Sequence, residues 1–240
     1  MSTAIHSAFA SGSAEPLVQR AWWGYLLWMA AAALLGFAIA EICAGLLHLP
    51  RSIYLIPYVA LVSLFLYAFL RWSGLSLTEL FSHNWGWGVM GAVLVGAFLV
   101  SNIFSQPASA RATGLPLAFD LLWSGVVYGL IDALLLSVLP VLATWQAFSI
   151  LGWTNHWPGK IAVGAIAFIA SLLVTVCYHL GYPEYRAQGG VFGPSVGNGV
   201  MTLGYLLTNN PITAIFSHIV MHIAGVLRGS ATVIQLPPHY

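Results

Sequence analysis

Apolar residues fill the chain in long runs, and short stretches rich in polar residues, glycine or proline separate these runs. A helix needs about 20 residues to span the hydrocarbon core of a bilayer, and the runs are of that order. The pattern predicts an all-α fold, a polytopic membrane helical bundle of about seven transmembrane helices, with six or eight as the neighbouring counts. The predicted helices cover residues 21–48, 53–72, 85–104, 115–148, 161–181, 191–207 and 211–227.

The same runs set the domain boundaries. We expect a polar N-terminal tail at residues 1–20, one transmembrane helical domain at residues 21–228 and an extended C-terminal tail at residues 229–240. The first run exceeds the apolar core of a signal peptide, which has about 7–15 residues, so we interpret it as a retained helix. The run at residues 115–148 is longer than one crossing needs, and we expect it to tilt or to kink at Pro140, which lacks a backbone N–H.

The composition supports a membrane location. Hydrophobic residues make up 60% of the chain and charged residues only 5%, whereas a soluble domain carries about 25% charged residues. The lipid bilayer is therefore the expected partner, and a formal net charge of +1 gives no indication of nucleic-acid binding. Arginine and lysine divide three against four between the two sides of a seven-helix arrangement, so the sequence does not set the membrane orientation. Cys43 and Cys177 lie in apolar runs and are expected to pack there.

Four polar residues inside the apolar runs are candidates for a functional site. His218 and His222 are four residues apart, which places both rings on one face of a helix and allows them to bind one metal ion. No glutamate lies between them, so the pattern differs from the soluble His-Glu-x-x-His motif. Asp132 costs about 2.5–3.5 kcal/mol near the centre of a membrane helix, and such residues usually face the bundle interior and mark sites. His179, near the end of the fifth run, is the fourth candidate.

Together these residues predict a metal site. One carboxylate and three imidazoles suit zinc, with one coordination position left for water. We expect His179, His218 and His222 to bind the metal and Asp132 to act as the catalytic base, and we expect no other cofactor. Because neighbouring helices alternate in direction, His179 lies nearer the membrane surface than the others. A shared site therefore requires its helix to run past Gly181, or the site to lie off-centre.

Each of these residues also has a purely structural interpretation. Intramembrane histidines often only hydrogen-bond a neighbouring helix, and Asp132 can pair with a histidine or with Tyr128. For Glu41, in the first run, we expect an interfacial or packing role.

Three stretches follow one another in the order of a known set of motifs. Residues 129–137 hold an aspartate in an apolar helix, Thr175 precedes His179 by four positions, and residues 193–222 combine a glycine-rich helix, a turn and a histidine pair. In this they resemble the CPBP family of intramembrane metalloproteases, which includes CAAX prenyl endopeptidases and bacteriocin-processing proteins. The family pattern is a Glu-Glu-x-x-x-Arg helix, a Phe-x-x-x-His helix and a His-x-x-x-Asn helix. The resemblance covers residues 115–227, about half of the chain.

The resemblance implies a CAAX-like intramembrane endopeptidase that uses a metal-activated water inside the bilayer. Membrane or lipidated peptides would be its substrates, and we expect an integral protein of a bacterial inner (cytoplasmic) membrane. The sequence departs from the family pattern. Ile131-Asp132, or Asp132-Ala133 in the other register, stands in place of the glutamate pair, and Leu136 or Ser137 stands in place of the arginine. Thr175 replaces the phenylalanine, and His222 stands where asparagine is common.

These departures leave three hypotheses. The first is a metallohydrolase with Asp132 as the base; if Asp132 is itself a metal ligand, no base remains unless Glu41 reaches the site. The second is a non-catalytic membrane relative that acts as an immunity factor, scaffold or partner subunit. The third is a haem or quinone protein, with His179 and one of His218 and His222 as axial ligands from facing helices.

Overall fold

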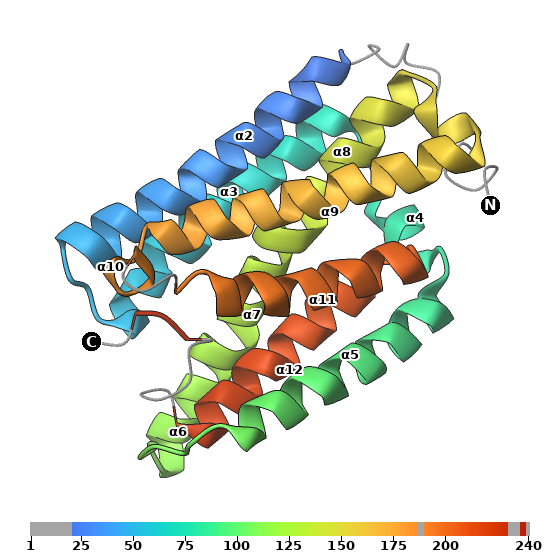
Figure 1. Ribbon diagram of the computed structural model, residues 1–240. Helices are drawn as coiled ribbons and strands as arrows, with labels where there is room; N and C mark the ends of the chain where they lie inside the picture. Colours follow the sequence, from blue (N-terminus) through green and yellow to red (C-terminus); the bar gives the residue numbers. More distant parts are fainter. Residues whose placement is uncertain (1–20, 187–189, 230–235, 239–240) are drawn as a thin grey trace.

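The computed structural model describes residues 21–186, 190–229 and 236–238 (Figure 1). Every regular element within these ranges is helical, and none is a β-strand. η1, η2 and η3 are wide π-helical turns, and η4 is a 3₁₀ turn. In chain order the elements are α2 (Trp22–Ile39), η1 (Ala40–Leu46), α3 (Arg51–Ser73), α4 (Leu77–Ser82), α5 (Trp85–Ser105), α6 (Gly114–Asp120), η2 (Leu121–Val127), α7 (Tyr128–Asp132), η3 (Ala133–Val138), α8 (Leu139–Ile150), η4 (Trp153–Asn155), α9 (Trp157–Leu180), α10 (Pro183–Arg186), α11 (Phe192–Thr208) and α12 (Ile212–Arg228).

The helix boundaries agree with the predicted apolar runs to within a few residues. α11 and α12 have 17 residues each, which is short for a crossing of the bilayer. The all-α class and a membrane-embedded helical bundle are supported, whereas the predicted number of seven crossings is not confirmed. In the part of the chain that the structure describes, five helices are long and apolar enough to span a membrane: Trp22–Leu46, Arg51–Ser73, Trp85–Ser105, Gly114–Ile150 and Trp157–Leu180.

The helix Gly114–Ile150, which we call the central helix, forms the core of the bundle. It joins α6, η2, α7, η3 and α8 without a break, and 72% of its most apolar stretch is buried, against 22–39% for the other four long helices. Leu135, Leu136 and Leu139 are among its buried apolar residues. A π-helical turn rotates the residues that follow it relative to a regular α-helix. One such turn, η3, begins directly after Asp132.

α12 packs between α5 and the central helix, and the contact with the central helix is unusually close (Figure 1). A Cβ atom at Gly129 would lie 2.8 Å from the Cα atom of Ile219 on α12. Small residues permit this approach of two backbones, which is the main route to tight helix packing in a membrane. Asp132 follows Gly129 by three positions and therefore lies on the same face of its helix. The close contact thus brings the α12 histidines next to Asp132.

Four arginines mark one end of the bundle. Because consecutive helices alternate in direction, α3 begins at this end and α5, α9 and α12 finish there. Arg228 donates a 2.8 Å hydrogen bond to the carbonyl of Gln106, at the end of α5. Arg111 donates a 3.1 Å hydrogen bond to the carbonyl of Leu227. We call this end the arginine face, after Arg51, Arg111, Arg186 and Arg228.

A methyl group at Gly129 tests the close helix contact. Gly129→Ala places a Cβ atom 2.8 Å from the backbone of α12, so the helices must separate. We expect a loss of about 1–3 kcal/mol in the free energy of unfolding, the usual cost of overpacking. Gly164→Ala is the matched control, because nothing lies within 4 Å of a Cβ atom there. Thermal unfolding in detergent measures both variants, and equal midpoints would contradict the expectation.

Candidate metal centre

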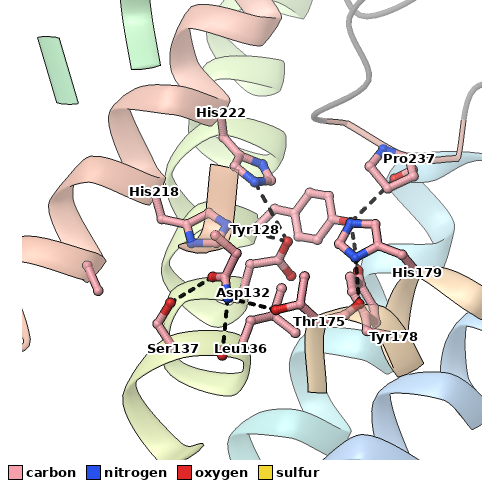
Figure 2. A network of polar contacts seen from close by, with 12 residues as sticks. Tyr128, Asp132, Leu136, Ser137, Thr175, Tyr178, His179, His218, His222 and Pro237 are labelled. Atoms are coloured by element: carbon pink, nitrogen blue, oxygen red, sulfur yellow. Dashed lines mark hydrogen bonds and ion pairs between the residues drawn. The ribbon is translucent and has the colours of Figure 1, made fainter. Parts of the chain in front are cut away.

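The structure brings Asp132, His218 and His222 together inside the bundle (Figure 2). Each residue offers one ligand atom, and the three atoms lie within 4.8 Å of one another. Asp132 Oδ2 lies 3.7 Å from His222 Nε2 and 4.0 Å from His218 Nε2. All three residues are buried, with exposed fractions of 1–3%. Their polar groups therefore face one another and not the surrounding lipid.

The local helix geometry explains the cluster. His218 and His222 lie one turn apart on α12, with ring centroids separated by 5.2 Å. Asp132 is the last residue of α7, and the π-helical turn η3 starts at the next residue. Single π-helical turns inside α-helices occur frequently at functional sites. The histidine spacing was visible in the sequence, whereas the π-helical turn was not.

Tyr58, on α3, orients the carboxylate of Asp132. Its hydroxyl donates a 2.5 Å hydrogen bond to Asp132 Oδ1, which leaves Oδ2 directed at the two histidines. The Tyr58 ring stacks on the rings of Tyr54 and Tyr178, at centroid distances of 5.6 and 5.4 Å. A third helix thus fixes which carboxylate oxygen is available to a ligand.

The donor set fits a small divalent metal ion. Zinc bonds of about 2.0–2.1 Å place tetrahedral nitrogen and oxygen ligands about 3.3 Å apart. The distances from Asp132 Oδ2 to the two imidazoles are 3.7 and 4.0 Å, and the three ligand atoms lie within 4.8 Å of one another. The imidazole rings would therefore have to turn inward around a bound ion. A buried carboxylate beside imidazoles needs a compensating positive charge, and a bound cation would supply it.

The Nδ1 atoms of the two α12 histidines are less well satisfied. A metal-binding histidine usually donates its other ring N–H to a carbonyl, a carboxylate or water. Within the described residues neither His218 Nδ1 nor His222 Nδ1 has a hydrogen-bond partner, although both atoms are buried. The backbone of Ser124 interacts with the His222 ring, but outside the geometry of a normal hydrogen bond.

His179 lines the same cavity as the cluster but is not one of its three members. Its Nδ1 donates a 2.8 Å hydrogen bond to the carbonyl of Thr175, so Nε2 carries the lone pair of the neutral ring. Tyr178 and Tyr185 contact the imidazole edge to face, each at a centroid distance of 5.0 Å. Burial raises the pKa of Tyr185 above its ordinary value, so this neighbour stays neutral. Two of the three predicted histidine ligands thus join Asp132, and the third lies beside them.

The site lies off-centre in the bundle. α9 ends at Leu180, so the fifth helix does not run past Gly181. His222 lies six residues before the end of α12, about 9 Å along the axis at about 1.5 Å per residue. This position brings it towards the level of His179, at the arginine face. Glu41 is not part of the cluster, because its carboxylate forms an ion pair with Arg186, in keeping with the expected packing role.

A cavity of about 250 Å³ adjoins the cluster. Asp132, three histidines and apolar residues of α5, α11 and α12 line it. Its outer part lies between the last turns of α5 and the first turns of α11, where Phe98 and Phe192 are 57% and 75% exposed. The cavity thus reaches the surface of the bundle between these two helices, near the arginine face.

A buried hydrogen-bond network, which the sequence did not reveal, connects the central helix with α9 and α11. Asn198 accepts a 2.7 Å hydrogen bond from Ser137 and donates a 2.9 Å hydrogen bond to Ser171. It also donates a 2.7 Å hydrogen bond to Thr175. Thr202 completes the set, with its hydroxyl 2.8 Å from that of Ser171. All five side chains are buried, so their mutual contacts replace those that water would provide.

Pro140 explains part of this network. Proline has no N–H, so the carbonyl four residues earlier, that of Leu136, loses its helical partner. Ser171 donates a 2.7 Å hydrogen bond to this carbonyl from α9. The central helix remains helical on both sides of Pro140. The proline that the sequence marks as a possible kink is therefore a point where another helix binds the backbone.

A group of buried tyrosines covers the other side of the cluster. The hydroxyl groups of Tyr128, Tyr178 and Tyr182 lie 2.6–3.3 Å from one another. The Tyr128 ring contacts His222 edge-on, at a centroid distance of 4.7 Å. Tyr54 and Tyr58 are four residues apart, as are Tyr178 and Tyr182. This is the spacing of the histidine pair, and it could have identified the tyrosine group from the sequence. The group consists of Tyr54, Tyr58, Tyr128, Tyr178 and Tyr182.

The chain matches no known protein family, no curated protein and no solved structure. The functional argument therefore rests on the residues and their geometry. Among the described residues these support an integral membrane protein with a buried Asp/His/His group that can hold a metal ion. The group does not by itself identify the metal.

Removal of Asn198 tests the buried network. Asn198→Ala leaves Ser137, Ser171 and Thr175 each without one buried partner, so we expect a loss of about 1–3 kcal/mol in the free energy of unfolding. Asn102→Ala is the control, because Asn102 lines the same cavity but is exposed. Thermal unfolding in detergent measures both. An Asn198→Ala protein as stable as the control would show that the network does not support the fold.

Proposed function

We propose that the protein is an intramembrane metallohydrolase that cleaves peptides as a divergent endopeptidase of the CPBP type. The observation that carries this proposal is the convergence of Asp132, His218 and His222 at one buried point beside a cavity. The choice of a peptide as substrate rests on the sequence resemblance alone. In this proposal α11 and the apolar helix α12 complete seven membrane crossings.

The three clustered residues would hold a zinc-class ion. Two imidazoles and one carboxylate are donors that zinc prefers, and three protein ligands leave a position for water, as in catalytic zinc sites. When bound, such an ion polarises a substrate carbonyl and allows a water to ionise near neutral pH. The apolar walls of the cavity would limit the access of bulk water to the reacting groups.

The distances favour an exchange of two predicted roles. The sequence predicts Asp132 as base and His179 as ligand. Asp132 Oδ2, however, faces the two α12 histidines at 3.7 and 4.0 Å, whereas His179 lies outside the cluster. His179 Nε2 carries a lone pair and can accept a proton from the attacking water. His179 would then act as the base in a site where Asp132 is a ligand.

A non-catalytic metal-binding membrane protein is the second candidate. One observation favours it: among the described residues that line the cavity, Asp132 is the sole carboxylate, whereas the family pattern has a pair of glutamates. Such a protein would act as an immunity factor, scaffold or partner subunit. We do not propose a haem protein, because the Asp132 carboxylate lies within 4.0 Å of the Nε2 atoms of both α12 histidines, where a haem iron would have to lie.

Metal content tests the proposal. We expect the purified chain to bind about one zinc-class ion, and His218→Ala, His222→Ala and Asp132→Asn to lose it, because each change removes one of three donors. His48→Ala, in an exposed loop, is the control and should keep the ion. Elemental analysis of detergent-purified protein measures the content. A folded wild-type protein that takes up no metal when dialysed against zinc would rule out the proposal.

The same preparations, assayed for hydrolysis, separate the two candidate functions. The probe is a quenched-fluorescent farnesylated peptide in proteoliposomes. Under the proposal, EDTA abolishes cleavage and added zinc restores it. The His179→Ala protein should keep its metal ion, but its turnover should fall by about 10²–10⁴-fold, which is the usual contribution of a general base. Stoichiometric metal without any cleavage would favour the non-catalytic candidate.

Loss of one hydroxyl tests the role of Tyr58. Tyr58→Phe removes the hydrogen bond to Asp132 Oδ1 but keeps the stacked ring, so we expect the affinity for zinc to fall by about 10–100-fold. Tyr54→Phe is the matched control, because its hydroxyl contacts Tyr178 and Tyr182 and not the aspartate. Competition with a fluorescent zinc chelator measures both affinities. An equal change in the two variants would mean that Tyr58 does not position the ligand.

A further inference from the structure

A short C-terminal stretch, residues 236–238, is buried although it belongs to no helix. Leu236 is 0% exposed, and Pro237 and Pro238 are buried as well. The sequence predicts an extended tail in this region, and tails usually remain at the surface unless specific contacts hold them. The burial of three successive residues therefore indicates a binding site for them on the bundle.

Side chains from two membrane helices hold the backbone of this stretch. Arg51, at the start of α3, donates a 2.9 Å hydrogen bond to the carbonyl of Pro238. The hydroxyl of Tyr128, on the central helix, lies 3.5 Å from the carbonyl of Pro237, at the long limit of a hydrogen bond. Proline carries a backbone carbonyl but no N–H, so the two prolines need hydrogen-bond donors only. Arginine and tyrosine supply such donors.

Arg51 has a further donor that the prolines do not use. Its Nε is buried and has no hydrogen-bond partner among the residues that the structure describes. The same side chain lines a small cavity of about 60 Å³ with Arg111, Asp120 and Ser124. A longer or differently placed peptide backbone can therefore find an additional donor at this point.

The stretch lies beside the residues that we propose act on a substrate. Tyr128 contacts His222 directly, and its hydroxyl is 2.7 Å from that of Tyr178, the neighbour of His179. The dashed line to Pro237 in Figure 2 marks the contact of its carbonyl with the Tyr128 hydroxyl. Residues 236–238 do not line the cavity between α5 and α11. The stretch thus lies against Tyr128, which contacts the proposed ligand His222, and outside the cavity between α5 and α11.

We propose that residues 236–238 occupy a peptide-binding subsite in which Arg51 and Tyr128 bind backbone carbonyls, and that the chain blocks this subsite with its own C-terminal stretch. The ligand class is a short, extended peptide with apolar and proline residues. A peptide from another molecule binds there once the stretch is displaced. One part of this inference rests on the proposed function: the subsite would hold a peptide substrate beside the metal centre. Peptide binding itself needs no metal, so the two proposals are tested separately.

The test compares the full chain with a variant that lacks residues 236–240, both in detergent with EDTA. The probe is a fluorescein-labelled peptide with the sequence of residues 235–240, and anisotropy measures its binding. We expect the deletion variant to bind the peptide at least about ten-fold more tightly, because the tethered stretch competes in the full chain. In the deletion variant Arg51→Ala should weaken binding about ten-fold, through loss of a charged donor. Arg71→Ala, at the other end of α3, is the control and should not.

A second variant keeps the test valid if the deletion impairs folding. A protease site inserted within residues 230–235 of the full chain allows the stretch to be cut after folding, and the labelled peptide should then exchange with it. A folded deletion variant or cut protein that binds no peptide would overturn the subsite, as would binding that Arg51→Ala leaves unchanged. Peptide binding by a chain that holds no metal under any condition would overturn the proposed hydrolase and leave the subsite in place.

Discussion

Burial of the Asp132 carboxylate is the constraint on which the rest of the structure depends. A carboxylate inside an apolar bundle loses its hydration, and only hydrogen bonds and a positive charge compensate for that loss. Tyr58 supplies the hydrogen bond from α3 at one oxygen, and the imidazoles of α12 face the other. Side chains of α3, α12 and the central helix must therefore meet at the same level along the bundle axis. The absence of a side chain at Gly129 allows α12 to come close enough for this contact.

The polar groups of α9 extend the same arrangement. Ser171, Thr175 and His179 follow one another at intervals of four residues and so form one stripe along the helix. Ser171 binds the carbonyl that Pro140 leaves free, and the carbonyl of Thr175 fixes the ring of His179. The buried network and His179, which we propose as the base, thus share a helix. A change that displaces α9 at Ser171 would also move the proposed base.

The sequence predicted the elements better than their contacts. Apolar runs have the length of membrane helices, so the helix boundaries followed from hydrophobicity, and the four-residue spacing of His218 and His222 placed them on one face. The positions of His179 and Asn198 depend on which helices are neighbours, and apolar periodicity does not determine that. The tyrosine group was missed because tyrosines in a membrane helix resemble interfacial residues, although here they are buried. The buried prolines at residues 237 and 238 depend on Arg51, which is distant in the sequence.

X-ray absorption spectroscopy at the zinc K-edge of the purified, zinc-loaded protein tests the central claim most directly. The account predicts four nitrogen or oxygen ligands at about 2.0–2.1 Å, with scattering from two imidazoles. Three imidazoles would return His179 to the ligand set and contradict the exchange of roles that the distances favour. Sulfur ligation, or a folded protein with no bound zinc, would contradict the metal centre itself.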